Sequence, residues 1–150
     1  YRLHGVLCDD MGLGKTLQTL CMLALDHHRN PNAPPSLVVC PPTLTGHWVY
    51  EAEKFLQAKD LSVIQYAGTP PEREKLRPRV PHYRLVVASY DIVRKDFEFF
   101  ENIQWNYCVL DEGHIIKNGK TKSAKAAKRL HAHHRLILSG TPVQNDVLEL

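Results

Sequence analysis

The sequence predicts an α/β fold in which a mostly parallel central sheet carries helices on both faces. Three observations support this fold class. Short apolar runs recur along the chain, as in strands that are buried on both faces. Helical segments separate these runs, as connections between parallel strands require. Polar, reactive side chains follow the ends of the runs, where α/β sheets bind their ligands. The 150 residues are enough for one such domain.

The first predicted strand, at residues 3–8, is an apolar run that leads toward a helix. This helix runs from about Lys15 to His28, and its apolar residues 17–25 would pack on the sheet. The prolines in residues 29–35 cannot continue it, because proline lacks a backbone N–H and clashes with the preceding turn. Those residues are therefore predicted to form a surface loop.

Five further strands are predicted from apolar and β-branched runs. They lie at residues 36–40, 61–66, 84–90, 106–111 and 135–139. Four helices are predicted between them. The first is capped by Thr43 or Thr45 and ends near Leu56, and the third begins after Asp91 as its cap. The second and fourth are predicted at residues 72–79 and 123–130. Strands and helices thus alternate along the whole chain.

The composition is that of a globular domain, with 43% hydrophobic and 23% charged residues. The net charge of +3 permits nucleic-acid binding but does not argue for it. No apolar run approaches the roughly 18 residues of a membrane span, and the N-terminus is not a signal peptide, so no membrane partner is expected. The chain begins within a predicted strand, which suggests a fragment of a longer protein.

Cysteine and histidine are present, but they are not spaced as metal ligands. Cys8, Cys21, Cys40 and Cys108 are far apart and form no Cys-x-x-Cys pair, which favours buried thiols in a reducing compartment. Several of the nine histidines lie at element ends, at residues 27–28 and 131–134, and are expected to be solvated. Neither a zinc site nor a disulfide is predicted.

The organising motif lies between the first strand and the first helix. Residues 9–16 are Asp-Asp-Met-Gly-Leu-Gly-Lys-Thr, the tail of a phosphate-binding loop. Its glycines let successive N–H groups point at one anion, and the helix N-terminus adds partial positive charge. Lys15 would reach the β- and γ-phosphates, and the Thr16 hydroxyl would bind Mg²⁺. The strict pattern has glycine where this chain has Asp9, so a glycine-rich turn with a solvated Lys15 is the alternative.

Two adjacent carboxylates, Asp111 and Glu112, follow the fifth strand on the same sheet edge as Lys15 and Thr16. Asp111 could hold Mg²⁺ through its water shell, because Mg²⁺ prefers hard oxygen ligands. Glu112 could orient or deprotonate an attacking water. The alternative is a solvated turn at the end of a strand. Together with the Gly-Lys-Thr motif, the pair predicts a site that binds and hydrolyses a nucleotide.

Polar segments also follow the sixth, second and fourth strands. Ser139 and Thr141 could hydrogen-bond His114 and relay the state of the γ-phosphate, or they could form an ordinary polar turn. The segments after the second and fourth strands offer hydroxyls, amides and helix N-termini that suit the phosphates of a nucleic-acid backbone. The alternative is that they form ordinary helix caps. The DNA-backbone candidates are Thr43, Thr45, Gly46, His47, Trp48, Ser89 and Tyr90.

Taken in order, these segments resemble the motifs of a known family. Residues 9–18, 41–48, 89–91, 111–118 and 138–145 resemble motifs I, Ia, Ib, II and III of the Swi/Snf-type ATPases, which are superfamily-two helicase-like DNA translocases. The resemblance covers essentially the whole chain, and an aspartate at the position of Asp9 is usual in that family. Gly113 stands where the family normally has alanine. Taken together, Gly113 and residues 8–10 and 41–48 make the chain resemble the subfamily of ATPases associated with TATA-binding protein.

The resemblance implies that residues 1–150 are a partial first lobe, P-loop and RecA-like, of a two-lobed motor whose second lobe is absent. It implies that ATP and Mg²⁺ bind at Asp9, Asp10, Met11, Gly12, Leu13, Gly14, Lys15 and Thr16, with Thr16 and Asp111 serving the metal. Lys15, Asp111 and Glu112 would be catalytic, while His114, Ser139, Thr141 and Gln144 would couple the nucleotide to the DNA-facing segments. Double-stranded DNA is the implied partner, TATA-binding protein the implied client through regions outside this stretch, and the nucleus the implied location.

Other functions stay open at this point. A nucleotide-gated binding module with little turnover is disfavoured because Lys15, Asp111 and Glu112 are all intact. A strand-separating helicase is disfavoured by the residues of motifs I and III, and a nucleosome remodeller of another subfamily is a further alternative. An arginine finger from a second lobe is worth about 10³–10⁵ in rate. These residues alone are therefore expected to hydrolyse ATP negligibly.

Overall fold

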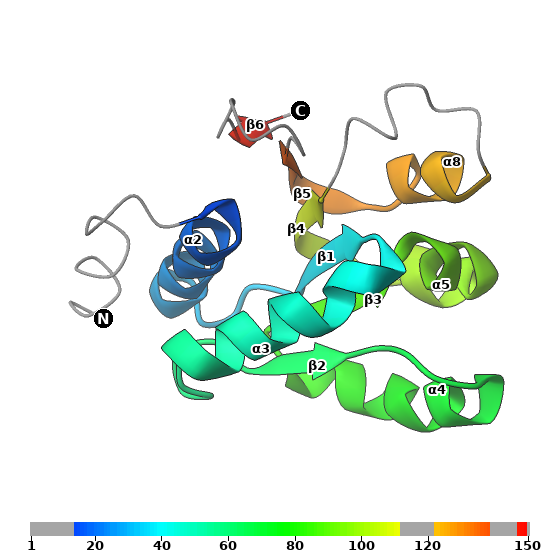
Figure 1. Ribbon diagram of the computed structural model, residues 1–150, viewed down its shortest axis with the longest axis horizontal. Coiled ribbons are helices and arrows are strands. Elements are labelled where there is room, and N and C mark those ends of the chain that lie inside the picture. The colour runs from blue at the N-terminus through cyan, green and yellow to red at the C-terminus, as the bar shows by residue number, and fades with distance from the viewer. Residues whose placement is uncertain (1–13, 112–121, 139–146, 150) are drawn as a thin grey trace.

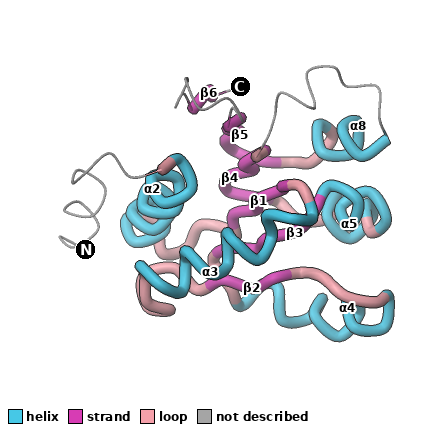
Figure 2. The backbone as a smooth tube through the Cα atoms, in the orientation of Figure 1, coloured by secondary structure: helices cyan, strands magenta, loops and turns pink. Residues whose placement is uncertain are grey.

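The computed structural model describes residues 14–111, 122–138 and 147–149 of the chain. The strand predicted at residues 3–8 lies outside these residues. Within them, one sheet lies between two layers of helices (Figure 1 and Figure 2). This confirms the three-layer α/β architecture predicted from the sequence.

The sheet has the strand order β2-β3-β1-β4-β5-β6. Its strands are β1 (Ser36–Cys40), β2 (Val63–Gln65), β3 (Leu85–Ser89), β4 (Trp105–Leu110), β5 (Ala132–Leu138) and β6 (Val147–Glu149). All neighbouring pairs are parallel except β5 and β6, which pair antiparallel. The edge strand β6 was not predicted, because a three-residue segment carries too little pattern to distinguish a strand from a turn.

Two helices cover one face of the sheet, α2 (Lys15–Arg29) and α3 (Thr45–Phe55), with the short 3-10 helix η1 (Pro42–Leu44) before α3. The other face is covered by α4 (Pro70–Leu76), η2 (Arg77–His82), α5 (Tyr90–Lys95), α6 (Phe97–Glu101) and α8 (Lys122–Lys128). Figure 1 shows α2 and α3 on one side of the strands and α5 and α8 on the other. The predicted parallel sheet with helices on both faces is confirmed.

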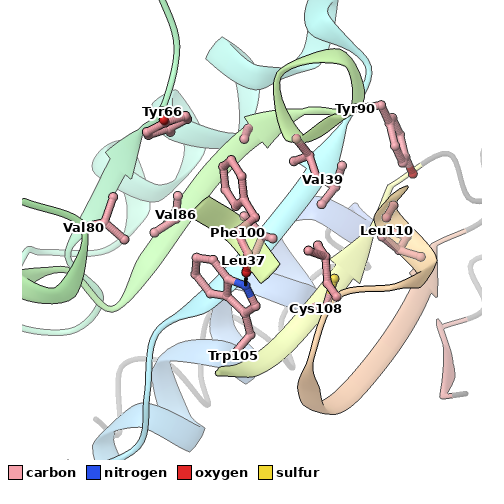
Figure 3. Packing of buried hydrophobic residues seen from close by; sticks show 14 of the residues in the cluster. Leu37, Val39, Tyr66, Val80, Val86, Tyr90, Phe100, Trp105, Cys108 and Leu110 are labelled. Atoms are coloured by element: carbon pink, nitrogen blue, oxygen red, sulfur yellow. Dashed lines mark hydrogen bonds between the residues drawn. The ribbon is translucent and has the colours of Figure 1, made fainter. Parts of the chain in front are cut away.

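The alternation of side chains along β1 explains why this central strand is mostly apolar. Leu37 and Val39 join the core beneath α5 and α6, which also contains Phe100 and Trp105 (Figure 3). The next residues along the strand, Val38 and Cys40, join the core beneath α2 and α3, with Leu20 and Trp48. Because both faces are buried, the strand is mainly apolar, and its polar residue Ser36 is paired with His27.

Two of the predicted helix caps were wrong. The N-cap position of α3 is Leu44, whose side chain cannot accept a hydrogen bond, and Thr45 is already the first helical residue, its hydroxyl donating to the Pro42 carbonyl oxygen at 3.1 Å. The cap of α5 is Ser89, not Asp91: its Oγ accepts from the Ile92 N–H at 3.2 Å. The chain enters α5 directly from β3, so the helix begins earlier than the sequence suggests.

The expectation that His27 is solvated was also wrong. His27 is 1% exposed, and its Nε2 lies 2.8 Å from the Ser36 hydroxyl. It lies on the face of α2 that carries Leu20 and Leu23, so helical spacing was the signal that predicts its burial. Burial lowers its pKa, and nearby Arg84 lowers it further, against the opposing charge of Asp26.

The cysteines within the described residues are buried, as predicted for Cys21, Cys40 and Cys108. Burial raises the pKa of the Cys40 and Cys108 thiols to about 12, so both stay protonated at neutral pH. Over the same ranges, no three His, Cys, Asp or Glu side chains gather in a group that could hold a metal ion. None of the helices in the described part of the chain is both long and apolar enough to span a bilayer.

Candidate functional site

The direction of α2 places its first turn at the carboxyl edge of the sheet. The last turn of the helix contacts the starts of three strands: His27 contacts Ser36, the Arg84 guanidinium donates to the His27 carbonyl, and the Asn106 amide donates to Asp26 at 2.7 Å. The helix therefore runs back along the strands. Its 15 residues span about 22 Å, and five-residue strands span about 16 Å, so Lys15 lies at or beyond the strand ends.

The start of α2 has the features of a phosphate-binding turn. Gly14 occupies the N-cap position with an extended backbone and no side-chain cap. Among the residues that the structure describes, a Cβ built at Gly14 would meet nothing within 4 Å. Lys15 and Thr16 follow as the first two residues of the helix, and both are half-buried. The uncapped N-terminus suits an anion.

Asp111 lies directly after β4, at the same edge of the sheet. Its backbone N–H donates to the Val39 carbonyl oxygen at 2.8 Å, so its main chain extends the pairing of β4 with β1. The Trp48 indole Nε1–H donates to Asp111 Oδ2 at 2.8 Å. The Tyr90 hydroxyl donates to the Asp111 carbonyl oxygen at 2.7 Å. The structure therefore brings together the segments that follow β1, β3 and β4.

The negative charge of Asp111 also affects the pKa of the Cys40 thiol. The pKa of Cys40 is raised mainly by burial and additionally by the negative charge of Asp111. Cys40 Sγ lies 3.9 Å from the Ala88 carbonyl oxygen, its acceptor. With its thiol protonated, Cys40 adds no further negative charge next to Asp111.

The DNA-backbone candidates separate into an exposed and a buried set. Thr43, Gly46 and His47 are exposed around the start of α3. The buried set consists of Thr45, Trp48, Ser89 and Tyr90, which are 8%, 0%, 6% and 9% exposed. Their polar atoms form hydrogen bonds within the domain. The DNA-contact role of all seven residues stays a prediction, and Thr43, Gly46 and His47 are the exposed ones among them.

Several predicted site residues lie outside the residues that the structure describes. They are Asp9, Asp10, Met11, Gly12 and Leu13 of the loop, Glu112 and His114 after β4, and Ser139, Thr141 and Gln144 after β5. Their roles stay predictions from the sequence. The described members of the nucleotide set are Gly14, Lys15, Thr16 and Asp111.

The sequence missed the two contacts to Asp111. Trp48 and Tyr90 follow β1 and β3, which was recognised, but both were considered only as candidates for contacts with a DNA backbone. The usable signal was their type, because a buried tryptophan or tyrosine needs a partner for its N–H or O–H. Which partner they find depends on the lateral order of the strands.

Asp96, which joins α5 to α6, is a second carboxylate that the sequence analysis did not single out. It forms ion pairs with two arginine side chains. Its Oδ2 accepts from Arg73 Nε at 2.8 Å and from the Tyr66 hydroxyl at 2.7 Å, and it lies 3.5 Å from Arg77 Nη2. Burial would raise the pKa of the Asp96 carboxyl, but the hydrogen bonds from Arg73 and Tyr66 and both positive charges outweigh it and hold the pKa below its usual range. Arg73 also donates to the Gly68 carbonyl oxygen at 2.7 Å. This cluster ties α4 to the α5–α6 corner.

A three-layer domain with Gly-Lys-Thr at the start of a helix and an aspartate after a neighbouring strand is the arrangement typical of P-loop nucleotide-binding proteins. The comparison with protein families is more specific, because the model of the SNF2-related domain matches residues 2–150. This chain belongs to that family.

Individual relatives are similar over the whole chain. TATA-binding protein-associated factor 172 of Homo sapiens is 59% identical over 161 residues, covering 100% of this chain and 9% of the human protein. TATA-binding protein-associated factor BTAF1 of Arabidopsis thaliana is 50% identical over 156 residues, covering 100% of this chain and 8% of the plant protein. Helicase swr1 of Schizosaccharomyces pombe is 36% identical, covering 98% of this chain and 12% of its own length. The chain thus spans about a tenth of these relatives.

A solved structure agrees with the fold. The Sulfolobus solfataricus SWI2/SNF2 ATPase core, solved in complex with double-stranded DNA, superposes with a TM-score of 0.74 at 35% sequence identity. The match covers 91% of this chain and 27% of that chain. The three-layer domain described above is therefore the fold of a lobe in a known SWI2/SNF2 core.

Proposed function

We propose that this chain is the ATP-binding lobe of a DNA-dependent ATPase that translocates on double-stranded DNA and remodels protein–DNA complexes. The observation that carries the proposal is that the start of α2 and Asp111 are both placed toward the same edge of the sheet. Membership of the SNF2-related family and the match to a core solved with double-stranded DNA support the same activity.

The described residues fit ATP and Mg²⁺. Within the described residues no atom lies within 4 Å of a Cβ added at Gly14, and Lys15 supplies the positive charge that the phosphates need. The Thr16 hydroxyl and the Asp111 carboxylate are hard oxygen donors of the kind Mg²⁺ prefers. When bound, Mg²⁺ would neutralise charge on the phosphates. Glu112 is proposed to orient and deprotonate the attacking water, and the remaining loop residues to hold the nucleotide.

Double-stranded DNA is the proposed partner, and the exposed residues Thr43, Gly46 and His47 are the proposed backbone contacts. The proposed client is TATA-binding protein, removed from DNA in transcription regulation in the nucleus. This choice rests on the relatives named TATA-binding protein-associated factors, which are 50–59% identical to this chain. Helicase swr1 is less similar at 36%, which places a remodeller of another subfamily second.

The lobe is proposed to act with a second one. The match to the SWI2/SNF2 core covers 27% of that solved chain, which leaves room for a second lobe in the complete motor. A finger residue from that lobe would stabilise the charge that develops during phosphoryl transfer. The 150 residues alone are therefore proposed to bind ATP and to hydrolyse it negligibly.

The test is ATP hydrolysis by the two-lobed protein, with and without duplex DNA, for the wild type and Glu112→Gln. We expect DNA-stimulated turnover that falls by about 10²–10⁴-fold in the variant, because glutamine cannot accept a proton. Magnesium-dependent ATP binding without stimulated turnover would instead support the gated binding module. Separation of the two DNA strands during hydrolysis would contradict the translocase and support a true helicase.

A further inference from the structure

The Asp111 residue is held by two aromatic side chains that come from opposite faces of the sheet. Trp48 belongs to the core beneath α2 and α3, and it is fully buried. Tyr90 belongs to the core on the other face, beneath α5, and is 9% exposed (Figure 3). Each donates one hydrogen bond to Asp111, the first to the side chain and the second to the backbone carbonyl oxygen.

These two bonds and the backbone bond to Val39 act on three different atoms of Asp111. The indole N–H can only donate a hydrogen bond, so Asp111 Oδ2 must be the acceptor in this contact. Hydrogen bonds to an ionised carboxylate are stronger than neutral ones. The carboxylate is therefore fixed in direction by a neutral group that leaves its negative charge in place.

We propose that Trp48 and Tyr90 are positioning residues, which hold the Asp111 carboxylate in the orientation needed to serve magnesium-bound nucleotide. The inference rests on the proposed function, because it deepens the role of Asp111 in the same site. Partners of this kind orient a metal-binding side chain without touching the metal, and losing one typically costs about 10–100-fold in metal affinity or activity.

The same geometry ties the exposed start of α3 to the nucleotide site. Trp48 follows Gly46 and His47 within the first turn of α3, and those two residues are exposed. A displacement of this turn moves the indole and, through its hydrogen bond, the Asp111 carboxylate. Trp48 therefore belongs to the nucleotide site, although its neighbours face outward.

The test compares Trp48→Phe with Trp105→Phe in the two-lobed protein. Both changes keep an aromatic ring in a fully buried position and remove one indole N–H. Trp105 donates to the Phe100 carbonyl oxygen at 3.1 Å, at the opposite end of β4 from Asp111, and is the matched control. The probe is a fluorescent ADP analogue titrated with and without Mg²⁺, together with the Mg²⁺ concentration that gives half-maximal ATP hydrolysis.

For Trp48→Phe we expect the Mg²⁺ requirement to rise about tenfold, with nucleotide affinity in EDTA unchanged. Trp105→Phe should leave the Mg²⁺ requirement at the wild-type value. Tyr90→Phe, which removes one oxygen and no ring, should raise the requirement less than Trp48→Phe, because its bond reaches the backbone and not the carboxylate. This second variant keeps the test decisive if Trp48→Phe does not fold.

A double variant separates positioning from loss of stability. If Trp48 acts through Asp111, adding Trp48→Phe to Asp111→Asn should change the Mg²⁺ dependence of ADP-analogue binding no further. An unchanged requirement in both Trp48→Phe and Tyr90→Phe would overturn the inference, as would an equal rise in Trp105→Phe. A wild-type protein that lacks DNA-stimulated turnover would refute the proposed function instead, and the EDTA-controlled binding would still decide the inference.

Discussion

Asp96 and Asp111 are both carboxylates held by hydrogen bonds from aromatic side chains, but they are held in different ways. Asp96 accepts a bond from the Tyr66 hydroxyl and also pairs with the guanidinium groups of Arg73 and Arg77. Asp111 Oδ2 accepts from the neutral indole of Trp48. Arg73 and Arg77 bring two positive charges to Asp96, whereas the indole N–H that donates to Asp111 is neutral.

The difference separates a carboxylate that serves the fold from one that serves a site. Removing a buried counter-charge leaves an uncompensated ion, which is costly. A neutral donor loses only one hydrogen bond when its acceptor changes. The Asp96 cluster should therefore dominate stability, and the Asp111 cluster should dominate activity. Two sets of variants test this contrast, and a third prediction concerns a residue away from both clusters.

The largest expected effect comes from the matched pair Asp96→Asn and Asp111→Asn. Asp96→Asn leaves the buried Arg73 without its counter-charge, and we expect a loss of about 3 kcal/mol in the free energy of unfolding. Asp111→Asn should cost about 1 kcal/mol or less, because the amide oxygen can still accept from Trp48. Urea unfolding of the chain measures both.

In ATP hydrolysis the order should be the opposite, with the larger loss in Asp111→Asn and the smaller loss in Asp96→Asn. Asp111→Asn should abolish DNA-stimulated ATP hydrolysis by the two-lobed protein, while Asp96→Asn should retain it at temperatures where the domain is folded. Equal losses of stability in the two variants would refute the distinction between a structural and a functional carboxylate.

A smaller effect is expected from two glycines, one beside each cluster. Gly46→Ala should raise stability by about 0.5–1 kcal/mol, because Gly46 lies in α3 with nothing within 4 Å of an added Cβ. Gly68→Ala should lower stability by about 1–2 kcal/mol, since its φ of +110° disfavours a side chain and the Cβ would lie 3.0 Å from Glu72 Oε1.

Fluorescence anisotropy with a labelled duplex then tests the exposed surface. Gly46→Ala should weaken DNA binding although it stabilises the domain, because the new methyl group would stand where a phosphate backbone is proposed to approach. Gly68→Ala should leave DNA affinity unchanged. A Gly46→Ala variant that is more stable and binds the duplex normally would remove Gly46 from the proposed DNA surface.

The smallest effect is limited to a pH window and comes from His27, away from both carboxylates. Burial lowers the pKa of His27, so the unfolded chain binds its proton more readily than the folded chain does. Stability from this residue is therefore complete above an unfolded pKa of about 6.5 and is lost as the pH falls through the folded value.

The unfolding free energy of the wild type should decline as the pH falls below about 6.5. We expect His27→Gln to flatten this decline, because glutamine cannot take up a proton. Urea unfolding at a series of pH values measures this slope. The exposed neighbour provides the control, and His28→Gln should keep the wild-type slope, since His27 is intact in it. An identical slope in all three proteins would show that His27 titrates equally in the folded and unfolded chains.

Much of the fold was predictable, because it depends on local patterns. The residues of β1, β3 and β4 form continuous apolar runs, and prolines stop both α2 and β1 where the sequence predicts. The predictions failed at helix starts, where α3 begins one residue after Leu44 and α5 is capped by Ser89. His27 was misassigned because its polarity was given more weight than its position on the apolar face of α2.

The sequence by itself determined the fold class, the order of the elements and the residue types that follow each strand, since these depend on periodicity and on neighbours along the chain. Only the tertiary structure decided what those residues contact. Trp48 and Asp111 are 63 residues apart, and Tyr90 and Asp111 are 21 apart. They meet because the sheet places β1 between β3 and β4. That lateral order is set by packing on both faces of the sheet, which no single segment of the chain encodes.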